Sequence, residues 1–333
     1  MNTYYQLKKQ QDILQKLAWA LCCFFYLSFF NANAQQWEYL GANTGISNGG
    51  ASYLNMARDA SGNIYLSYYD VNVTKGSVQK FDGTSWSYVG GTPGITTGFA
   101  TYNSICTGAN GNVYYTNQGS GFEVRQFNGT AWSSLPVVTS ATVNFQSSAV
   151  TPSGVLVAAS NEATGTVKRF VNGAWEQVGT TGFAGAVPYY LDMVVGSDNV
   201  IYLSYANNGN VYVVKNNVNA SSTQAWEHVG GTAGVAPATS SEQFRASMAI
   251  NSANNIYLAY TSVSGAGNKL NIKKFNGTSW EQVGAENFSP NRVHYVSIAV
   301  SPSGTPYVAY STFENNPDNK NTVAKFNGTN WEN

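Results

Sequence analysis

The chain has 333 residues, only 10% of them are charged, and its 17 Lys plus Arg balance its 17 Asp plus Glu. No basic block or net positive charge exists to collect phosphates, which argues against a nucleic-acid partner. The 33 Gly, 22 Tyr, 16 Phe and 8 Trp favour strands and turns, so we expect an all-β protein. At 43% hydrophobic residues, the chain can bury a large core.

Three cysteines and two histidines limit the chemistry that the chain can support. Metal sites and nucleophilic triads depend on these residue types. Cys22 and Cys23 lie in an N-terminal segment that we expect to be removed, which leaves Cys106 without a partner. We therefore expect no disulfide framework, no metal site and no cofactor.

The first 34 residues have the pattern of a secretory signal peptide. Three lysines precede an apolar run from Leu17 to Phe30, and Ala32-Asn33-Ala34 then provides a small-x-small cleavage site. The run of about 14 residues is short for a membrane span, although an uncleaved anchor or a lipoprotein is an alternative. We expect a signal peptide at residues 1–34, a single domain at residues 35–333, and a secreted or cell-surface protein without a membrane span.

Tryptophans recur at regular intervals after this segment. Their mean spacing of about 49 residues is typical of four-stranded propeller blades. Most of them end a motif of the form Phe-Asp/Asn-Gly-Thr-x-Trp, and we expect their rings to pack between blades rather than to stack on sugars. The seven residues are Trp37, Trp86, Trp132, Trp175, Trp226, Trp280 and Trp331.

Four strands can be placed within the first repeat by alternation and turn chemistry. They span Tyr53–Arg58, Ile64–Tyr69, Ser77–Phe81 and Ser85–Val89. A lone sheet of this kind cannot cover both of its faces, so we expect the repeats to stack radially as blades of a β-propeller. A parallel β-helix is the structural alternative, but its coils are shorter than this period.

The number of blades depends on how the ring closes. Six sets of the first three strands occur, but there are seven segments of the fourth type, at 37–41 and then in every repeat up to a short one at 331–333. The segment at Trp37 could close the ring by pairing with the last blade, which leaves one strand of the fourth type surplus. Either the final three residues compete with that segment, or the sequence stops partway through a longer protein with another blade. We expect six blades in a monomer, with seven or eight as alternatives.

One family resemblance rests on the first three strands of the repeat. Ala57-Arg58-Asp59-Ala60-Ser61-Gly62-Asn63-Ile64-Tyr65-Leu66, followed by Val78-Gln79-Lys80-Phe81, resembles the NHL-type and related bacterial β-propeller repeats. The fourth strand, with its Gly-Thr-x-Trp pattern, departs from the NHL repeat. The resemblance implies a propeller fold, secretion and an interaction role, and it implies no particular reaction.

Two columns of residues line one face of the first strands when the repeats are aligned, because residues two apart share a face. The first column is Tyr53, Tyr102, Phe145, Tyr190, Arg245 and Tyr295, and the second is Asn55, Ser104, Ser147, Asp192, Ser247 and Ser297. We expect the first column to ring the channel mouth on the side of the long, variable loops, where aromatic rings and hydroxyls can hold a sugar or a peptide. The structural interpretation is that the aromatics fill gaps between blades and the hydroxyls satisfy neighbouring backbone groups.

Departures from these columns indicate where a site could be. Arg245 replaces an aromatic residue, Asp192 replaces a serine, and His294 and Glu242 lie near the mouth. The resulting hypothesis of a ligand-binding site, with no catalytic or metal-binding residue, names Tyr53, Tyr102, Tyr190, Asp192, Arg245, Tyr295 and His294.

An enzyme needs more than the sequence offers. The resemblance to NHL-type propellers implies that a lyase of that kind would need a histidine-rich metal site, and two histidines are too few for one. The sequence also has no phosphate-binding loop and no nucleophile elbow. We therefore favour a secreted, non-catalytic binding or surface-interaction module that recognises carbohydrate or protein through the variable-loop face. The alternative is a carbohydrate-active hydrolase or lyase that uses Asp192, Glu242 and Arg245 at the channel mouth.

Overall fold

The computed structural model describes residues 38–41, 45–231, 234–238, 246–312 and 321–333. The chain divides into two units, residues 1–44 and 45–333, and all regular elements described lie in the second. The expected signal peptide at residues 1–34 and Trp37 lie outside the described residues, and residues 38–41 form no strand. In the described part, no helix is long and apolar enough to cross a membrane.

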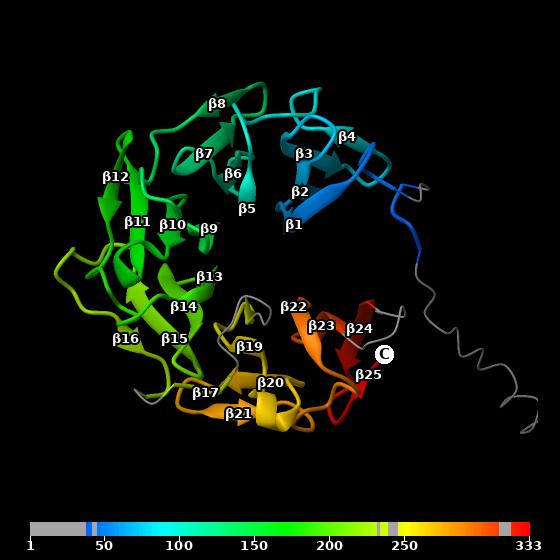
Figure 1. Cartoon of the computed structure of the whole chain (residues 1–333), viewed down its shortest axis with the longest axis vertical. Helices are drawn as coiled ribbons and strands as arrows, with labels where there is room; N and C mark the ends of the chain where they lie inside the picture. The colour runs from blue at the N-terminus through cyan, green and yellow to red at the C-terminus, as the bar shows by residue number, and fades with distance from the viewer. Residues whose placement is uncertain (1–37, 42–44, 232–233, 239–245, 313–320) are drawn as a thin grey trace, which may run out of the picture. The chain divides into compact units, whose positions relative to one another are not determined.

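Six antiparallel sheets follow one another along the second unit, arranged around a central axis (Figure 1). Each has four strands in sequence order from the axis outward, which confirms an all-β propeller with six four-stranded blades. Blade 1 contains β1 (Ala51–Arg58), β2 (Ile64–Asp70), β3 (Lys75–Phe81) and β4 (Trp86–Tyr88); blade 2 contains β5 (Thr101–Thr107), β6 (Val113–Gln118), β7 (Phe122–Phe127) and β8 (Trp132–Ser134); blade 3 contains β9 (Gln146–Val150), β10 (Leu156–Ser160), β11 (Thr166–Val171) and β12 (Ala174–Gln177).

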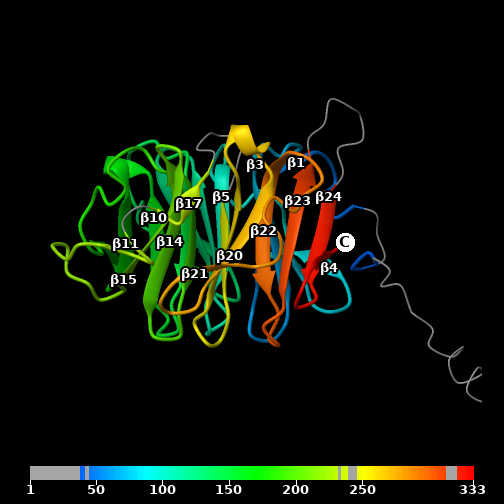
Figure 2. The same ribbon diagram turned by 90° about the horizontal axis from the view of Figure 1, so that it is seen from below.

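The last three blades repeat this order, and the strands of all six run from one face of the ring to the other (Figure 2). A short extra strand joins blade 4 beside its third strand. Blade 4 contains β13 (Tyr189–Val195), β14 (Val200–Asn207), β15 (Asn210–Asn217), β16 (Glu227–His228) and the extra β17 (Ala236–Pro237); blade 5 contains β18 (Ser247–Ile250), β19 (Ile256–Thr261), β20 (Leu270–Phe275) and β21 (Trp280–Gln282); blade 6 contains β22 (Val293–Val300), β23 (Pro306–Thr312), β24 (Asn321–Phe326) and β25 (Trp331–Glu332).

Aspartate side chains in the hairpin turns accept local hydrogen bonds that set the ends of the strands. The Asp59 carboxylate accepts hydrogen bonds from the backbone N–H of Asn63 at 2.9 Å and from its side-chain amide at 2.6 Å. In the β3–β4 hairpin, Asp82 accepts from the backbone N–H groups of Thr84 and Ser85, both at 2.9 Å. Asp and Asn favour turns through such local bonds, which explains why the turn clusters predicted the strand limits of blade 1 closely.

The outer strand of blade 6 comes from the end of the chain. Phe326 on β24 pairs with Trp331 on β25, so the terminal residues fill the fourth-strand position of their own blade. The final three residues, which the sequence offered as a competitor of the segment at Trp37, thus supply this strand.

Tryptophans of the outer strands tie successive blades together. The indole Nε1 of Trp132 donates to the Val89 carbonyl of the preceding blade at 2.7 Å, and Trp280 donates likewise to Val229 at 2.8 Å. Within its own blade, Trp280 packs against Phe275, with ring centroids 5.3 Å apart. The prediction that the tryptophans pack between blades is confirmed for Trp132, Trp175, Trp280 and Trp331, whose indoles reach the preceding blade. The repeated Phe and Trp are partners in one contact.

Five clusters of buried hydrophobic side chains fill the interfaces between successive blades. In one of them, Phe145 of blade 3 packs with Leu191 and Met193 of blade 4. Among the described residues, no such cluster joins blade 6 to blade 1. Met56 on β1 is 67% exposed and Tyr295 on β22 is 53% exposed, whereas the described equivalents of Met56 are buried and those of Tyr295 are buried or half-buried. We call this uncovered boundary the seam.

Candidate functional site

Aromatic rings of the first four blades meet at the start of the inner strands. Tyr53 and Tyr102 have ring centroids 5.2 Å apart, Tyr102 and Phe145 are 6.4 Å apart, and Phe145 and Tyr190 are 5.1 Å apart. They border a cavity of about 90 Å³. We call this the channel-mouth pocket. Its lining residues are Tyr53, Asn55, Tyr102, Asn103, Asn144, Phe145, Gln146, Tyr190 and Leu191.

The three tyrosines have an unusual backbone conformation. Their φ angles are 54° at Tyr53, 46° at Tyr102 and 51° at Tyr190, in the left-handed region that bulky residues rarely adopt. Each lies at a β-bulge, where the pairing of the inner strand with the next strand shifts register. A bulge of this type usually places glycine at the left-handed position. Three blades thus hold a tyrosine in a strained conformation at equivalent places.

Amide side chains from the next blade hold these bulges. The Tyr53 carbonyl accepts from Asn103 Nδ2 at 2.7 Å, and the Tyr102 carbonyl accepts from Gln146 Nε2. Asn55 Nδ2 donates to the Asn103 carbonyl at 2.7 Å. In the described part of the chain, Gln146 Oε1 is buried without a hydrogen-bond partner. The pocket lining is therefore polar but uncharged, with one buried acceptor left unsatisfied.

Residues of the second column connect the inner strands of neighbouring blades. Asp192 Oδ2 accepts from the backbone N–H of Met248 at 2.7 Å, and Ser147 Oγ accepts from that of Met193 at 3.2 Å. The structural interpretation of this column, in which its side chains satisfy neighbouring backbone groups, holds at these positions. Asp192 does not line the channel-mouth pocket.

The remaining residues of the hypothesis lie elsewhere. Tyr295 is on the exposed side of β22, and its ring centroid is 6.3 Å from that of His294 rather than in the pocket. Burial, and then the positive charge of Arg292, lower the pKa of His294. Arg245 and Glu242 lie outside the described residues. Of the seven residues, the structure brings Tyr53, Tyr102 and Tyr190 together.

The sequence did not indicate Asn103, Asn144 and Gln146 as lining residues. Strict alternation puts Asn103 and Gln146 on the opposite strand face from the aromatic column. The bulge at Tyr102 inserts one extra residue, and this breaks the alternation that such a prediction needs. An amide directly after the aromatic residue, in blades 2 and 3, was the available signal.

Metal-binding groups are also relevant to the site. Across the described ranges, no three His, Cys, Asp or Glu side chains come together in a way that could hold a metal ion.

No family model matches the sequence, and no curated protein matches it. Solved structures do resemble the fold. The SapL1 lectin in complex with α-methyl fucoside aligns with a TM-score of 0.56 at 14% identity, covering 86% of this chain and 95% of the lectin. A PL25 ulvan lyase aligns with a TM-score of 0.57 at 11% identity, covering 86% of this chain and 84% of the lyase.

A third similar structure is the six-bladed lectin of Aleuria aurantia, with a TM-score of 0.52 and 14% identity over 84% of this chain and 92% of the lectin. At such identities these likenesses establish the fold alone. One of them, the Aleuria aurantia lectin, has six blades like this chain.

Proposed function

We propose that the chain is an exported, non-catalytic carbohydrate-binding propeller whose ligand occupies the channel-mouth pocket. The observation that carries this proposal is the convergence of three left-handed tyrosines, at equivalent bulges, on one pocket. A bulky residue held in this region costs about 1–3 kcal/mol, and such strain concentrates at functional sites.

The chemistry of the lining supports a sugar ligand. Aromatic faces pack on the C–H groups of a sugar ring, and side-chain amides exchange hydrogen bonds with its hydroxyls. Because no charged side chain lines the pocket, a neutral sugar fits it better than an anionic one. The volume of about 90 Å³ is well below the range of about 300–1,000 Å³ that is usual for small-ligand pockets, so the pocket can admit part of one terminal sugar residue but no chain segment.

The lining also supports binding without turnover. Glycoside hydrolases use a pair of carboxylates on either side of the scissile bond, and none of the residues that line this pocket is Asp, Glu or His. Asp192, the carboxylate of the alternative hypothesis, is bonded to the backbone of blade 5. Two of the similar solved structures are lectins, and one of them contains α-methyl fucoside, so neutral monosaccharides are suitable first probes.

The test is a glycan array followed by calorimetry with α-methyl fucoside and other neutral methyl glycosides. Tyr102→Asn removes the ring while keeping a residue that tolerates positive φ, and it should weaken binding at least tenfold. Tyr295→Asn is the matched control, because it removes an aromatic residue of the same column that does not line the pocket, and it should leave affinity unchanged.

Two outcomes would contradict the proposal. Equal losses in Tyr102→Asn and Tyr295→Asn would remove the channel-mouth pocket as the site. Release of reducing ends or unsaturated products, lost in Asp192→Ser, would establish the carbohydrate-active enzyme instead.

A further inference from the structure

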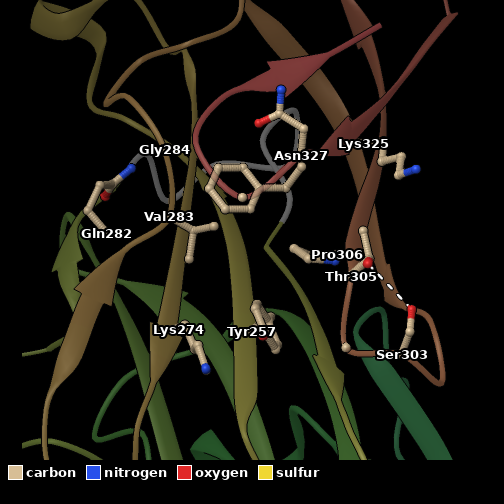
Figure 3. A pocket seen from close by; sticks show the side chains of 13 residues that line it. Tyr257, Lys274, Gln282, Val283, Gly284, Ser303, Thr305, Pro306, Lys325 and Asn327 are labelled. Atoms are coloured by element: carbon tan, nitrogen blue, oxygen red, sulfur yellow. Dashed lines mark hydrogen bonds between the residues drawn. The ribbon is translucent and has the colours of Figure 1, made fainter.

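A larger cavity of about 730 Å³ lies between blades 5 and 6 (Figure 3). Its walls are the end of β21 (residues 282–284), the β22–β23 turn (residues 303–305) and the β24–β25 turn (residues 326–328). The β22–β23 turn follows the end of the inner strand β22, whereas the channel-mouth pocket lies where inner strands begin. The two cavities share no lining residue. We call the larger one the blade 5–6 groove.

Two cations and no anion line the blade 5–6 groove. Lys274 and Lys325 are its charged residues, in a chain with only 10% charged residues and no net charge. Lys274 Nζ lies over the Tyr257 ring, 5.7 Å from its centroid, and Figure 3 shows the two side chains together. Neither lysine forms an ion pair within the part of the chain that the structure describes. Glu281 and Glu332 are the cross-strand neighbours of Lys274 and Lys325, but neither carboxylate lines the groove or forms an ion pair with these lysines in the described structure.

Other blade interfaces lack this combination. At the same register position, blade 2 has Gln126, paired with Tyr114, where blade 6 has Lys325. Blade 4 does have a lysine there, Lys215, but its ammonium is paired with Glu227 at 3.4 Å. Blade 1 has Lys80 over Tyr65 at 5.8 Å, and the residue at the same register position in blade 2 is the uncharged Gln126. Two unpaired lysines thus distinguish the blade 5–6 groove among the interfaces described.

Hydroxyl and amide groups complete the lining. The hydroxyl oxygens of Ser303 and Thr305 lie 3.4 Å apart, so they can share hydrogen bonds with neighbouring ligand oxygens. Gln282 Oε1 is buried and has no partner among the described residues, so it can accept from a ligand hydroxyl. A simple inorganic anion uses the lysines but offers no donor to this acceptor.

We propose that the blade 5–6 groove binds an anionic sugar residue, either a uronate or a sulfated sugar. The lysines attract the carboxylate or sulfate, while Ser303, Thr305 and Gln282 contact ring hydroxyls. The volume lies within the range of about 300–1,000 Å³ that is usual for small-ligand pockets. This site is separate from the channel-mouth pocket. The groove prefers an anionic sugar, whereas the channel-mouth pocket prefers a neutral one.

Calorimetry on the full chain tests the proposal with three oligosaccharides of similar length: an oligogalacturonate, a chondroitin sulfate fragment, and a neutral galactan. We expect one or both anionic ligands to bind, with affinity that falls as salt is added, and the neutral one to bind at least tenfold more weakly. The two anionic arms show whether carboxylate or sulfate is preferred. Inorganic sulfate is a fourth probe, expected to compete only weakly.

Variants locate the site. Lys274→Gln and Lys325→Gln should each reduce affinity for the anionic ligand at least tenfold, and Lys274→Arg should retain most of it. Lys80→Gln is the matched control, because it removes a lysine stacked on tyrosine outside the groove, and it should have no effect. Thermal unfolding of each variant confirms that the fold is intact.

Three results would overturn the proposal: no binding of either anionic sugar, an equal loss in Lys80→Gln, or sulfate competing as well as the oligosaccharides, which would indicate nonspecific anion attraction. Tyr102→Asn should leave binding in the groove unchanged. Failure at the channel mouth and failure in the groove are therefore distinguishable.

Discussion

Asp192 Oδ2 accepts a 2.7 Å hydrogen bond from the backbone N–H of Met248 on the inner strand of the next blade. Ser247 makes the equivalent bond to Ile298 at 3.4 Å one interface further along. The second column of the repeat therefore supplies acceptors that tie adjacent inner strands. A carboxylate is the stronger acceptor, because hydrogen bonds to charged groups exceed neutral ones in strength.

This tie predicts a difference in stability between two variants of the column. Asp192→Ala leaves the Met248 N–H without its acceptor and should lower the free energy of unfolding by about 1–3 kcal/mol. Ser297→Ala, at the exposed equivalent position on β22, should change it by less than about 0.5 kcal/mol. Urea unfolding followed by tryptophan fluorescence measures both. Equal effects would show that the column does not hold the blades together.

The seam provides a second matched pair, this time of methionines. Met193 is 6% exposed within the core between blades 3 and 4, whereas Met56, its equivalent in blade 1, is 67% exposed. Met193→Ala creates a cavity and should lower the free energy of unfolding, measured by urea denaturation, by about 2–5 kcal/mol. Met56→Ala should lower it by less than about 1 kcal/mol. Similar losses in both variants would mean that blade 1 is covered in solution by another surface.

The sequence predicted the blades because their signals are local and repeated. In the turn between β1 and β2, Asp59 accepts a hydrogen bond from the backbone of Asn63 within the same turn. The ends of both strands could therefore be predicted from a few neighbouring residues. The structural interpretation of the second column, in which its side chains satisfy neighbouring backbone groups, describes Asp192 and Ser147, although the binding hypothesis had singled out Asp192 as a ligand-binding residue. In each case, one period of the repeat contains all the information that the prediction needs.

The sites depend on features that no single period contains. The bulge at Tyr102 breaks the alternation and turns Asn103 toward a pocket that the neighbouring blades complete. The blade 5–6 groove needs Lys274 from one blade and Lys325 from the next, and it also needs the absence of a paired carboxylate, which only side-chain positions reveal. Each lysine on its own resembles the lysines of other repeats.

Trp280 and Trp226 differ in whether the indole N–H has a hydrogen-bond acceptor. Trp280 Nε1 donates to the Val229 carbonyl, whereas Trp226 Nε1 is buried without a partner in the described structure. Trp280→Phe should lower the free energy of unfolding by about 1 kcal/mol more than Trp226→Phe. The reason is that Trp280→Phe breaks a hydrogen bond, whereas Trp226→Phe removes a donor that has no acceptor. Chemical unfolding of the two variants tests this difference. A larger loss in Trp226→Phe would indicate that its N–H has a partner in solution.

The lowered pKa of His294 predicts a pH dependence of stability. Burial of the imidazole and the charge of Arg292 disfavour the protonated form in the folded protein. The unfolded chain takes up this proton near pH 6.5, whereas the folded chain does so at lower pH. The free energy of unfolding should therefore fall as the pH drops below about 6.5 and stop falling, for this group, below the folded pKa.

Variants of the two histidines isolate this contribution. His294→Gln should flatten the part of the stability profile just below pH 6.5, and His228→Gln, which keeps His294, should preserve it. Urea midpoints measured at intervals of half a pH unit give both profiles. An unchanged slope in His294→Gln would assign the dependence to other groups.

Cys106 is buried between blades 2 and 3, and this burial raises the pKa of its thiol to about 12. A hydrogen bond to the Ser148 hydroxyl at 3.7 Å only partly offsets the effect. Because the thiolate is the reactive form, we expect iodoacetamide at pH 8 to leave Cys106 unmodified in the native protein and to label it fully in urea. Peptide mapping by mass spectrometry distinguishes Cys106 from Cys22 and Cys23. Ser148→Ala should not expose the thiol, so rapid native labelling of either protein would show that the interface between blades 2 and 3 opens readily.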